Sequence, residues 1–505
     1  MPLIKSISGI RGTIGDTPDE DLTPVDVVKF TTAFVLLIKD KEKRKKEKIS
    51  TLTMLSTQEQ KAKGKNMSQI SILIGRDARI SGEMINYLIC NLLQNMGVNV
   101  IDVGLSTTPS VEMAVVKYKA NGGIILTASH NPMEWNALKL LNEKGEFISA
   151  EEGKQLLKIA ETVDIRAAMY NIFINKSTKK TGSYTQYYYA IEDHIDEILK
   201  LDLVDVKAIT ETNFSVVFDA VNSTGGIAIP KLLEKLGVKN YKGLYAEPTG
   251  IFPHNPEPLP EHLHEISLII QNSLLDTYHS SSFDVGFVVD PDVDRLAIVM
   301  ENGEMFGEEY TLVAVADYVL QYKKGNTVSN LSSSRALSDV SRKHGENCFA
   351  SAVGEVNVVE KMKETNAVIG GEGNGGVILP ELHYGRDALV GIALFLSFMA
   401  KSKLKCSEIK ARYPNYVISK NRIELTKEIN IQEILQKIAQ KYTDYNPITI
   451  DGVKIDFEQG WVHLRPSNTE PIIRIYAETE NKIETEKLVN KIKQELFSCW
   501  KNKKK

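Results

Sequence analysis

Short apolar runs typical of buried strands alternate with amphipathic helical patterns along most of the chain, and this alternation constrains the fold more than any other feature. Such alternation favours α/β layers, in which helices cover sheets. With 505 residues the chain is too long for one hydrophobic core, so three or four domains are expected. The last region differs, because strand-like runs at 461–464 and 472–476 precede a single helical pattern. We expect a smaller α+β domain there.

The N-terminal region contains one clear helix start and one polar stretch. Thr23 is a good N-cap, Pro24 fits the first helical position and Asp26 suits the first turn. Residues 40–68 are rich in Lys, Glu, Gln, Ser and Thr, so they are interpreted as a mobile insertion. The basic run at 41–46 suggests a nucleic-acid contact, but mixed charge without interleaved aromatic residues is more typical of a solvated helix extension or loop.

A serine with the surroundings of a nucleophile follows one apolar strand pattern. Ser129 comes directly after the run 123–126, with His130 beside it and Pro132 ending the turn. A hydroxyl held at a strand end beside a histidine is typical of covalent catalysis. Taken alone, these residues also fit an ordinary polar turn, because Ser, Asn and Pro are common in turns.

Three carboxylates at alternate positions follow another apolar strand pattern, 285–289. Asp290, Asp292 and Asp294 can converge on one hard cation, and ligation by carboxylate oxygens suits Mg²⁺. An EF-hand calcium loop is excluded, because the glycine and distant glutamate that it requires do not follow at the right spacing. A solvated acidic loop is the alternative. A site with few protein ligands leaves room for a substrate phosphate.

Two further loops carry groups suited to a sugar phosphate. Residues 370–376 place Glu372 among glycines, which let the backbone approach a ligand while the carboxylate accepts hydrogen bonds from hydroxyls. Alone, this segment also fits a simple glycine-rich turn. Residues 465–471, followed by Arg474, combine guanidinium groups with hydroxyls and successive backbone N–H groups, which suits a phosphate. The alternative for this loop is an exposed basic turn.

These four loops, in this order, resemble the phosphoserine, metal, sugar and phosphate-binding loops of the α-D-phosphohexomutase family. Segments 8–12, 75–82 and 253–258 also match the family pattern. The resemblance implies three similar α/β domains with mixed sheets and a smaller C-terminal α+β domain, four domains around a central cleft. The expected domain ranges, each with one loop, are 1–180, 181–304, 305–415 and 416–505.

The resemblance also implies roles for individual residues. Ser129 is the phosphoserine, and a hexose 1,6-bisphosphate is the intermediate and activator. Lys139 is the candidate general base, while Arg11 and His130 stabilise the transferring group, and Arg295 of the metal loop joins these catalytic residues. The ligands of Mg²⁺ are Ser129, Asp290, Asp292 and Asp294. The substrate-binding residues are Glu372 and Asn374 for the sugar, and Arg465, Ser467, Asn468, Thr469 and Arg474 for the phosphate.

Three departures from the commonest family pattern are visible. Pro291 and Val293 stand where many members have glycines, but the three aspartates between and beside them are intact. Ala137 replaces a common glycine close to Lys139. Asn374 stands where many members have serine, and this leaves the preferred sugar open. The combination is most similar to the archaeal-type phosphoglucosamine mutases.

The expected reaction is the interconversion of hexose 6-phosphate and 1-phosphate through a phosphoserine, with glucosamine phosphate as the favoured substrate. Phosphoglucomutase or phosphomannomutase activity is the alternative, because these sugars differ by one group or one stereocentre. A metal-dependent sugar phosphatase and a non-catalytic sugar-phosphate-binding protein are more distant. A dedicated phosphate loop argues against the first, and the intact Ser129 and Lys139 argue against the second.

Composition limits which partners and which cellular compartment are expected. A net charge of -4 gives no reason to expect a nucleic-acid partner. The sequence shows neither a leader pattern nor an apolar stretch near the roughly 18 residues of a membrane span. Its four cysteines show no metal or disulfide spacing. We expect a cytoplasmic protein with reduced thiols that binds a small-molecule sugar phosphate, has no membrane partner and is a monomer or homodimer.

Overall fold

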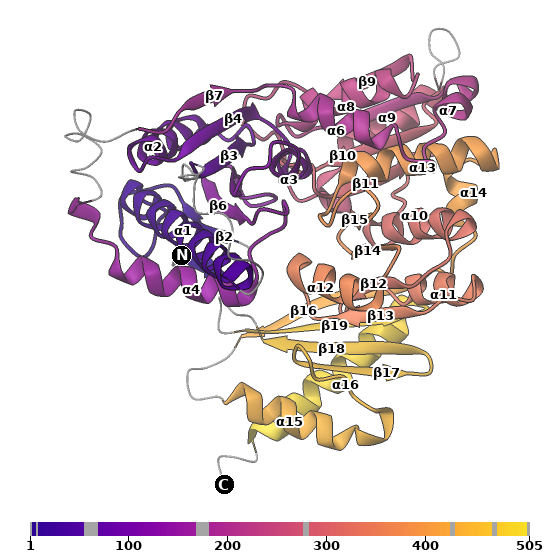
Figure 1. The fold of residues 1–505 in the computed structure, drawn as a ribbon. Helices are drawn as coiled ribbons and strands as arrows, with labels where there is room; N and C mark the ends of the chain where they lie inside the picture. The colour runs from indigo at the N-terminus through magenta and orange to yellow at the C-terminus, as the bar shows by residue number, and fades with distance from the viewer. Residues whose placement is uncertain are drawn as a thin grey trace.

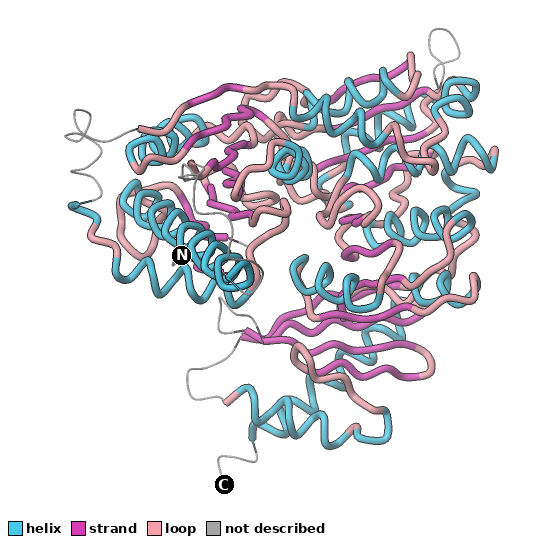
Figure 2. The backbone as a smooth tube through the Cα atoms, in the orientation of Figure 1, coloured by secondary structure: helices cyan, strands magenta, loops and turns pink. Residues whose placement is uncertain are grey.

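The computed structural model describes residues 3–6, 9–54, 69–167, 181–275, 282–424, 430–466 and 472–501. Within these ranges four sheets with their helices surround a central cleft (Figure 1). Figure 2 shows that the last sheet and its helices form a smaller body at one end of the molecule. We name the domains I to IV in chain order, one for each sheet. The predicted architecture of three mixed α/β domains and a smaller α+β domain is confirmed.

Domain I contains a seven-stranded mixed sheet in the order β1-β2-β6-β5-β3-β4-β7. β3 pairs in parallel with β4 and β5, whereas β6 runs antiparallel to β2 and β5. Every residue of β5 and β6 is buried, as expected for central strands covered on both faces. The elements are β1 (Ile4–Ser6), β2 (Gly9–Thr13), α1 (Pro24–Met54), β3 (Ser71–Arg76), α2 (Gly82–Asn95), β4 (Asn99–Leu105), α3 (Thr108–Lys117), β5 (Gly122–Leu126), β6 (Trp135–Leu141), α4 (Ala150–Thr162) and β7 (Tyr184–Gln186).

Helix α1 begins where the sequence predicts. The backbone N–H of Asp26 donates to Oγ1 of Thr23 over 3.2 Å, and the N–H of Thr23 donates back to the Asp26 carboxylate over 3.2 Å. This reciprocal cap satisfies two backbone donors at the helix start.

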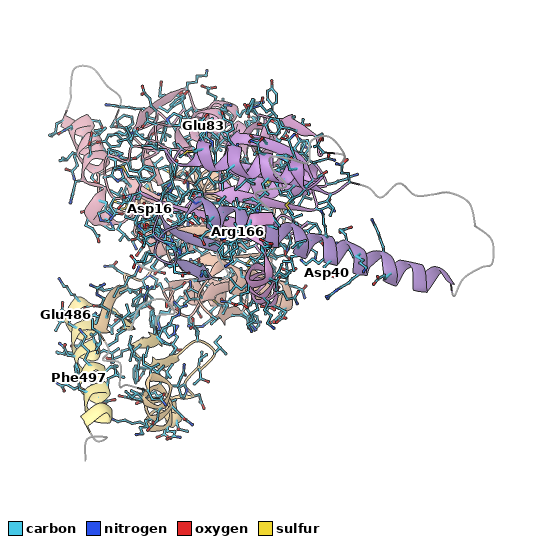
Figure 3. The ribbon with its side chains drawn as sticks, turned by 90° about the vertical axis from the view of Figure 1, so that its left-hand side faces the viewer. Asp16, Asp40, Glu83, Arg166, Glu486 and Phe497 are labelled. Carbon is cyan, nitrogen blue, oxygen red and sulfur yellow. The ribbon has the colours of Figure 1, made fainter. Side chains whose placement is uncertain are left out.

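The same helix continues to Met54 and projects from the body of the molecule (Figure 3). Residues 40–54 are thus part of a helix, as in the solvated helix extension considered for the basic run, and the mobility of the insertion at 40–68 stays a prediction. Ion pairs from Lys41 to Glu152 and from Lys45 to Glu143 fasten the first turns of this extension to the α4 region. Residues 55–68 lie outside the described residues.

Domain II has a four-stranded mixed sheet in the order β11-β10-β8-β9, in which only β11 is antiparallel to its neighbour. Its core is continuous with that of domain III through the helices between the two sheets. The elements are α6 (Ala190–Ile198), α7 (Val206–Thr212), β8 (Ser215–Asp219), α8 (Gly225–Lys235), β9 (Asn240–Leu244), η2 (Pro260–His262), α9 (His264–Leu275), β10 (Val285–Val289) and β11 (Leu296–Met300).

Domain III repeats this arrangement with the order β13-β12-β14-β15, where β15 is the antiparallel strand. Helix α13 is buried along nearly its whole length, because it lies between the sheets of domains II and III. The elements are α10 (Glu308–Tyr322), β12 (Thr327–Asn330), α11 (Ala336–Lys343), β13 (Cys348–Ser351), α12 (Glu355–Thr365), β14 (Ile369–Glu372), β15 (Gly376–Ile378), α13 (Ala388–Ser402) and α14 (Cys406–Lys410).

Domain IV has a fully antiparallel sheet in the order β16-β19-β18-β17, with two helices on one side. The elements are β16 (Val417–Glu424), α15 (Ile431–Lys441), η3 (Thr443–Tyr445), β17 (Val453–Phe457), β18 (Gly460–Pro466), β19 (Ile472–Thr479) and α16 (Lys482–Lys501).

The first domain boundary can be refined from the sheet pairing. β7 pairs in parallel with β4, with Tyr184 opposite Val100, so the domain I sheet extends beyond residue 180. We therefore propose that domain I ends after β7. The boundaries at residues 304 and 415 stay predictions.

Candidate active site

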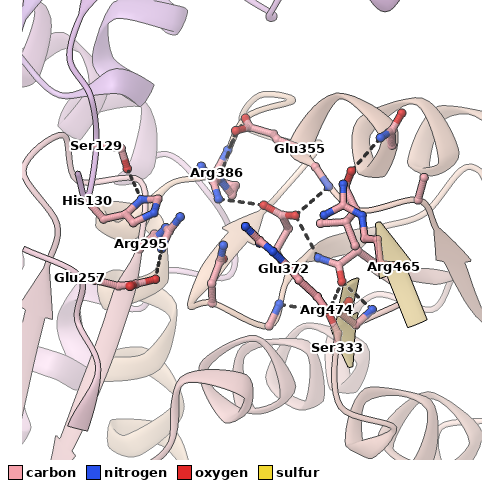
Figure 4. Close-up of a pocket in the computed structure, with 18 of the residues that line it drawn as sticks. Ser129, His130, Glu257, Arg295, Ser333, Glu355, Glu372, Arg386, Arg465 and Arg474 are labelled. Carbon is pink, nitrogen blue, oxygen red and sulfur yellow. Dashed lines mark hydrogen bonds and ion pairs between the residues drawn. The ribbon is translucent and has the colours of Figure 1, made fainter. Parts of the chain in front are cut away.

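A cleft of about 1220 Å³ is lined by side chains from all four domains. Three of the predicted loops follow the carboxyl ends of β5, β10 and β14, where ligands bind in open α/β sheets. The predicted residues that line the cleft are Arg11, Ser129, His130, Lys139, Arg295, Glu372, Asn374, Arg465 and Arg474. Ser467, Asn468 and Thr469 lie outside the described residues. Figure 4 shows Ser129 and Arg465 at opposite sides of the pocket.

Ser129 is held in a left-handed backbone conformation, with φ of 49°, directly after β5. Its O–H donates to Oδ2 of Asp290 over 2.6 Å, and Nδ1 of His130 lies 3.3 Å from the same hydroxyl. A residue other than glycine takes this conformation at a cost, so the surrounding contacts must fix the turn. The hydroxyl is thereby aimed at the metal loop of domain II.

Those fixing contacts come from Arg79, which the sequence reasoning did not single out. Its fully buried guanidinium donates to the backbone carbonyls of Ser129 and Asn131 over 2.6 Å each, and to that of Trp135 over 2.9 Å. Asp77 balances the charge at 3.1 Å. The sequence signal was the segment 75–82, which was matched to the family without a role for its second arginine.

The aspartates of the metal loop form one buried cluster. Asp290, Asp292 and Asp294 are fully buried, and each offers a carboxylate oxygen within 4.8 Å of the others. Among the described residues, Oδ1 of Asp292 and Oδ1 of Asp294 have no hydrogen-bond partner. Burial and the two neighbouring carboxylates raise the pKa of Asp290 well above its usual value. Unpartnered, crowded carboxylate oxygens of this kind fit a divalent cation with oxygen ligands.

Two groups from domain I also contact Asp292. The O–H of Thr108, at the N-terminus of α3, donates to its Oδ2 over 2.6 Å. Nζ of Lys139 lies 2.7 Å from the same oxygen and 3.6 Å from Asp294. Burial favours the neutral amine, but the facing carboxylates outweigh burial and raise the pKa of Lys139. In this geometry Lys139 is an ammonium group, so a role as a base would require that its ion pair with Asp292 is broken.

Three arginines from domains I, II and IV line the same cleft, close enough for the charges of two of them to act on the third. Burial lowers the pKa of Arg11 in domain I, and the charges of Arg295 in domain II and Arg474 in domain IV lower it further. Nε of Arg11 and Nε of Arg295 have no hydrogen-bond partner among the described residues. Burial and the same Arg295 lower the pKa of His130, so this imidazole is neutral. Converging cations with free N–H groups are the arrangement expected for binding a phosphoryl group.

The metal and sugar loops are joined by Arg386, a second residue that the sequence reasoning missed. Its guanidinium contacts Asp294 at 2.6 Å, Glu372 at 2.8 Å and Glu355 at 3.1 Å (Figure 4). No sequence pattern indicated it, because its partners Glu372, Glu355 and Asp294 lie 14, 31 and 92 residues earlier in the chain.

Glu372 is further positioned by domain III itself. Its Oε1 accepts hydrogen bonds from the amide of Asn330 at 2.9 Å and from the backbone N–H of Gly354 at 3.1 Å. Asn374 turns its side chain onto its own loop, because its Oδ1 accepts the N–H of Gly376 at 3.3 Å. The backbone of Gly373 passes so close to Glu309 that a Cβ atom there would lie 1.8 Å from the carboxylate. That carboxylate is the end of a flexible side chain, whereas at Gly375, with φ of 86°, a Cβ atom would lie 2.4 Å from the backbone oxygen of Leu296, so glycine is required there.

On the phosphate-binding side of the cleft, Arg465 and Arg474 are the predicted residues that the structure describes. Arg465 leaves β18 and its Nε lies 2.7 Å from the Asp451 carboxylate, which also accepts the N–H of Val353 in domain III. Domain IV is docked on domain III in this structure, and Arg335 supports this docking by donating to the carbonyls of Phe457 and Gly460.

Comparison with known proteins agrees with this geometry. Models of the phosphoglucomutase/phosphomannomutase family match at residues 55–166 (alpha/beta/alpha domain I), 192–303 (domain II), 307–416 (domain III) and 421–495 (C-terminal domain). The chain belongs to the phosphoglucomutase/phosphomannomutase family. It is a phosphohexomutase, an isomerase that moves a phosphoryl group on a hexose phosphate, and its aspartate triad can hold a metal ion.

Individual relatives belong to the same family, but their names refer to different sugars. A phosphoglucomutase/phosphomannomutase of Thermococcus kodakarensis is 34% identical over 414 residues, which cover 81% of this chain and 86% of the relative. A probable phosphoglucosamine mutase of Pyrococcus abyssi is 32% identical and covers 83% and 88%. A crystal structure of a phosphoglucomutase/phosphomannomutase family protein from Burkholderia thailandensis superposes with a TM-score of 0.77 at 23% identity, covering 98% of both chains.

The phosphohexomutase described here has no membrane-spanning candidate in its described part. None of the helices in that part combines the length and the apolar content that a membrane span needs.

Proposed function

We propose that this phosphohexomutase is a phosphoglucosamine mutase, which converts glucosamine 6-phosphate into glucosamine 1-phosphate. The observation that carries the mutase chemistry is a buried serine hydroxyl at one side of a cleft whose other side carries arginines. This arrangement supports two phosphate positions on one sugar, and a mutase needs both. The favoured sugar rests on relatives named as phosphoglucosamine mutases, such as that of Pyrococcus abyssi.

In this proposal Ser129 carries the phosphoryl group that is transferred. When the serine is free, Asp290 accepts its hydrogen bond at 2.6 Å and keeps the oxygen aimed into the cleft. Arg11, Arg295 and the neutral His130 stabilise the negative charge of the group in transfer. Mg²⁺ held by Ser129 and the three aspartates would neutralise negative charge on the phosphoryl oxygens.

The other phosphate of the sugar is bound by domain IV. Arg465 and Arg474 supply the guanidinium groups, and Ser467, Asn468 and Thr469 are proposed to complete this site. Glu372 and Asn374 orient the sugar ring between the two phosphates. After the first transfer the hexose bisphosphate turns around in the cleft, so that its second phosphate can return to Ser129.

Lys139 is proposed to remove the proton from the attacking sugar hydroxyl. Because its ammonium group is paired with Asp292 at 2.7 Å, this role requires that substrate or metal binding separates the two. A cation on Oδ1 of Asp292, which has no hydrogen-bond partner among the described residues, would compensate the negative charge that Lys139 faces on Oδ2. Cation binding by the aspartates therefore favours the neutral amine that a base needs.

The preference for an amino sugar has support from charge. Carboxylates gather on the domain III side of the cleft, where Glu372 and Glu309 both line the wall. Burial raises the pKa of Glu309 to about 8, so this group gains by facing a cation such as the 2-ammonium of glucosamine. A neutral 2-hydroxyl of glucose or mannose offers no such gain. The name of the Thermococcus kodakarensis relative favours phosphoglucomutase or phosphomannomutase activity as the second candidate.

Parallel kinetics test the proposal. The kcat/KM for the 1-phosphates of glucosamine, glucose and mannose is measured with Mg²⁺ and a catalytic amount of the matching bisphosphate, with Ser129→Ala as the control for contaminating mutase. We expect the highest value for glucosamine 1-phosphate, because the carboxylates favour its ammonium group. Equal or higher values for glucose or mannose phosphate would overturn the sugar assignment. Release of inorganic phosphate without isomer formation would instead indicate a phosphatase.

A further inference from the structure

A second cluster of metal-ligating side chains lies outside the active-site cleft, where domains I, II and III meet. His194 comes from α6 of domain II, while His383 and Asp387 precede α13 of domain III. Ligand atoms of these three residues all lie within 4.8 Å of one another. None of them lines the cleft.

The geometry of the three ligand atoms is convergent. Oδ2 of Asp387 lies 2.8 Å from Nε2 of His194 and 3.3 Å from Nε2 of His383. The other oxygen of Asp387 is occupied, because Oδ1 caps α13 by accepting the N–H groups of Leu389 at 2.8 Å and Val390 at 3.2 Å. The cap fixes the carboxylate, so Oδ2 is presented to the two imidazoles in a defined direction.

Both histidines have an outer partner on α3 of domain I. Nδ1 of His194 lies 3.0 Å from Oγ of Ser110, and Nδ1 of His383 lies 3.2 Å from the carboxylate of Glu112. Histidines that bind a metal through one nitrogen almost always bond a hydroxyl, carbonyl or carboxylate with the other. The cluster has this pattern at both of its histidines.

Charge balance also favours a cation. His194, Asp387 and Glu112 are each at most 1% exposed, so two carboxylates lie together with little access to water. Among the described residues, neither oxygen of Glu112 has a hydrogen bond of acceptable geometry, although His383 is close. His383 lies between Asp387 and Glu112 and contacts both carboxylates. A divalent ion bound beside these two buried carboxylates would balance their charge.

We propose that His194 Nε2, His383 Nε2 and Asp387 Oδ2 bind a divalent transition metal, of which zinc is the best match. Two imidazoles and one carboxylate suit zinc, cobalt or manganese, whereas the all-carboxylate triad of the active site suits magnesium. The metal joins domains II and III directly and domain I through Ser110 and Glu112. It is a structural site that fixes the relative positions of three domains.

The test uses the full chain without a polyhistidine tag. The protein is stripped with a chelator, saturated with Mg²⁺ to occupy the aspartate triad, and titrated with Co²⁺ while the visible d–d absorption is recorded. We expect one saturable Co²⁺ equivalent per chain, and displacement of Co²⁺ by Zn²⁺. Absence of saturable Co²⁺ binding by the wild type would overturn the proposal and leave a hydrogen-bonded cluster without metal.

Variants assign the site. His383→Gln should abolish Co²⁺ binding, and Glu112→Gln, which keeps the ligands but removes the outer carboxylate, should weaken it by about 10- to 100-fold. His264→Gln, on the exposed start of α9, is the matched control and should bind Co²⁺ as the wild type does. Unchanged Co²⁺ affinity in both His383→Gln and Glu112→Gln would contradict the assignment. If His383→Gln does not fold, the wild-type titration and Glu112→Gln decide the question.

Discussion

Replacing Arg386 by glutamine should destabilise the protein and impair catalysis together. Its guanidinium is the cation shared by Asp294, Glu372 and Glu355, at distances of 2.6, 2.8 and 3.1 Å. The side chain of Arg386 is 10% exposed, and those of its three partners are at most 8% exposed. Glutamine keeps one amide donor but no charge, so buried carboxylates lose their counter-ion.

The size of the effect follows from this burial. Removing one partner of a buried ion pair typically costs about 3–5 kcal/mol. Protonation of a carboxylate relieves part of this cost, at about 1.4 kcal/mol per pKa unit. Burial already raises the pKa of Glu355, which makes it the first group to take up a proton. We therefore expect the lower end, about 3 kcal/mol. For a cooperative unit of about 200 residues, this loss corresponds to a fall in Tm of about 6–12 °C.

Calorimetry and steady-state kinetics check this prediction. Arg342→Gln is the matched control, because its side chain on α11 is 75% exposed and, among the described residues, forms an ion pair only with Asp339 at 3.4 Å. Exposed pairs of this kind contribute about 0–1 kcal/mol. Arg386→Lys, which restores the charge but not the three-way contact, should recover part of the stability. A Tm within 2 °C of the control together with unchanged kcat/KM would refute the view that Arg386 holds the two loops together.

Three further outcomes are expected. Asp292→Asn should lower kcat by orders of magnitude in Mg²⁺, because it removes a charged ligand and the partner of Lys139, and full wild-type activity in excess chelator would exclude the metal. Arg465→Ala should lower kcat/KM by about 10- to 100-fold, since a charged hydrogen bond contributes about 1.5–3 kcal/mol, and more bisphosphate should escape in single turnovers. Burial lowers the pKa of His463 to about 4, below the roughly 6.5 of the unfolded chain. Between these two pKa values the unfolded chain binds one proton more at His463 than the folded chain. The stability that the neutral imidazole contributes is therefore present above pH 6.5 and lost as the pH falls toward 4. His463→Gln should flatten the dependence of Tm on pH in that window.

The convergence of the loops could be predicted from the sequence because strand ends determine it. Ser129, Asp290 and Glu372 each stand at or directly after a buried strand, and strands of α/β sheets deliver their carboxyl ends to one side. The resemblance to the family supplied the order of the domains. Element bounds such as the start of α1 followed from local capping chemistry at Thr23.

What the sequence did not predict depends on contacts between distant residues. Arg386 contacts Asp294, which lies 92 residues earlier, and nothing near Arg386 in the sequence indicates that pairing. The full length of α1 was not predicted for the same reason, because polar composition left both a helix extension and a loop open, and Glu152, the partner of Lys41, lies far away in the sequence. Local composition does not reveal such contacts between distant residues.

The most direct test of the central claim follows the phosphoryl group of Ser129. Protein labelled there with radioactive phosphate is mixed, in a single turnover, with unlabelled hexose 6-phosphate of the sugar that turns over fastest. The account predicts that the label passes to the C1 oxygen and leaves in the hexose 1-phosphate, while Ser129 regains an unlabelled phosphoryl group from C6. Ser129→Ala should incorporate no label. Product without label, or label released as inorganic phosphate, would contradict transfer through Ser129.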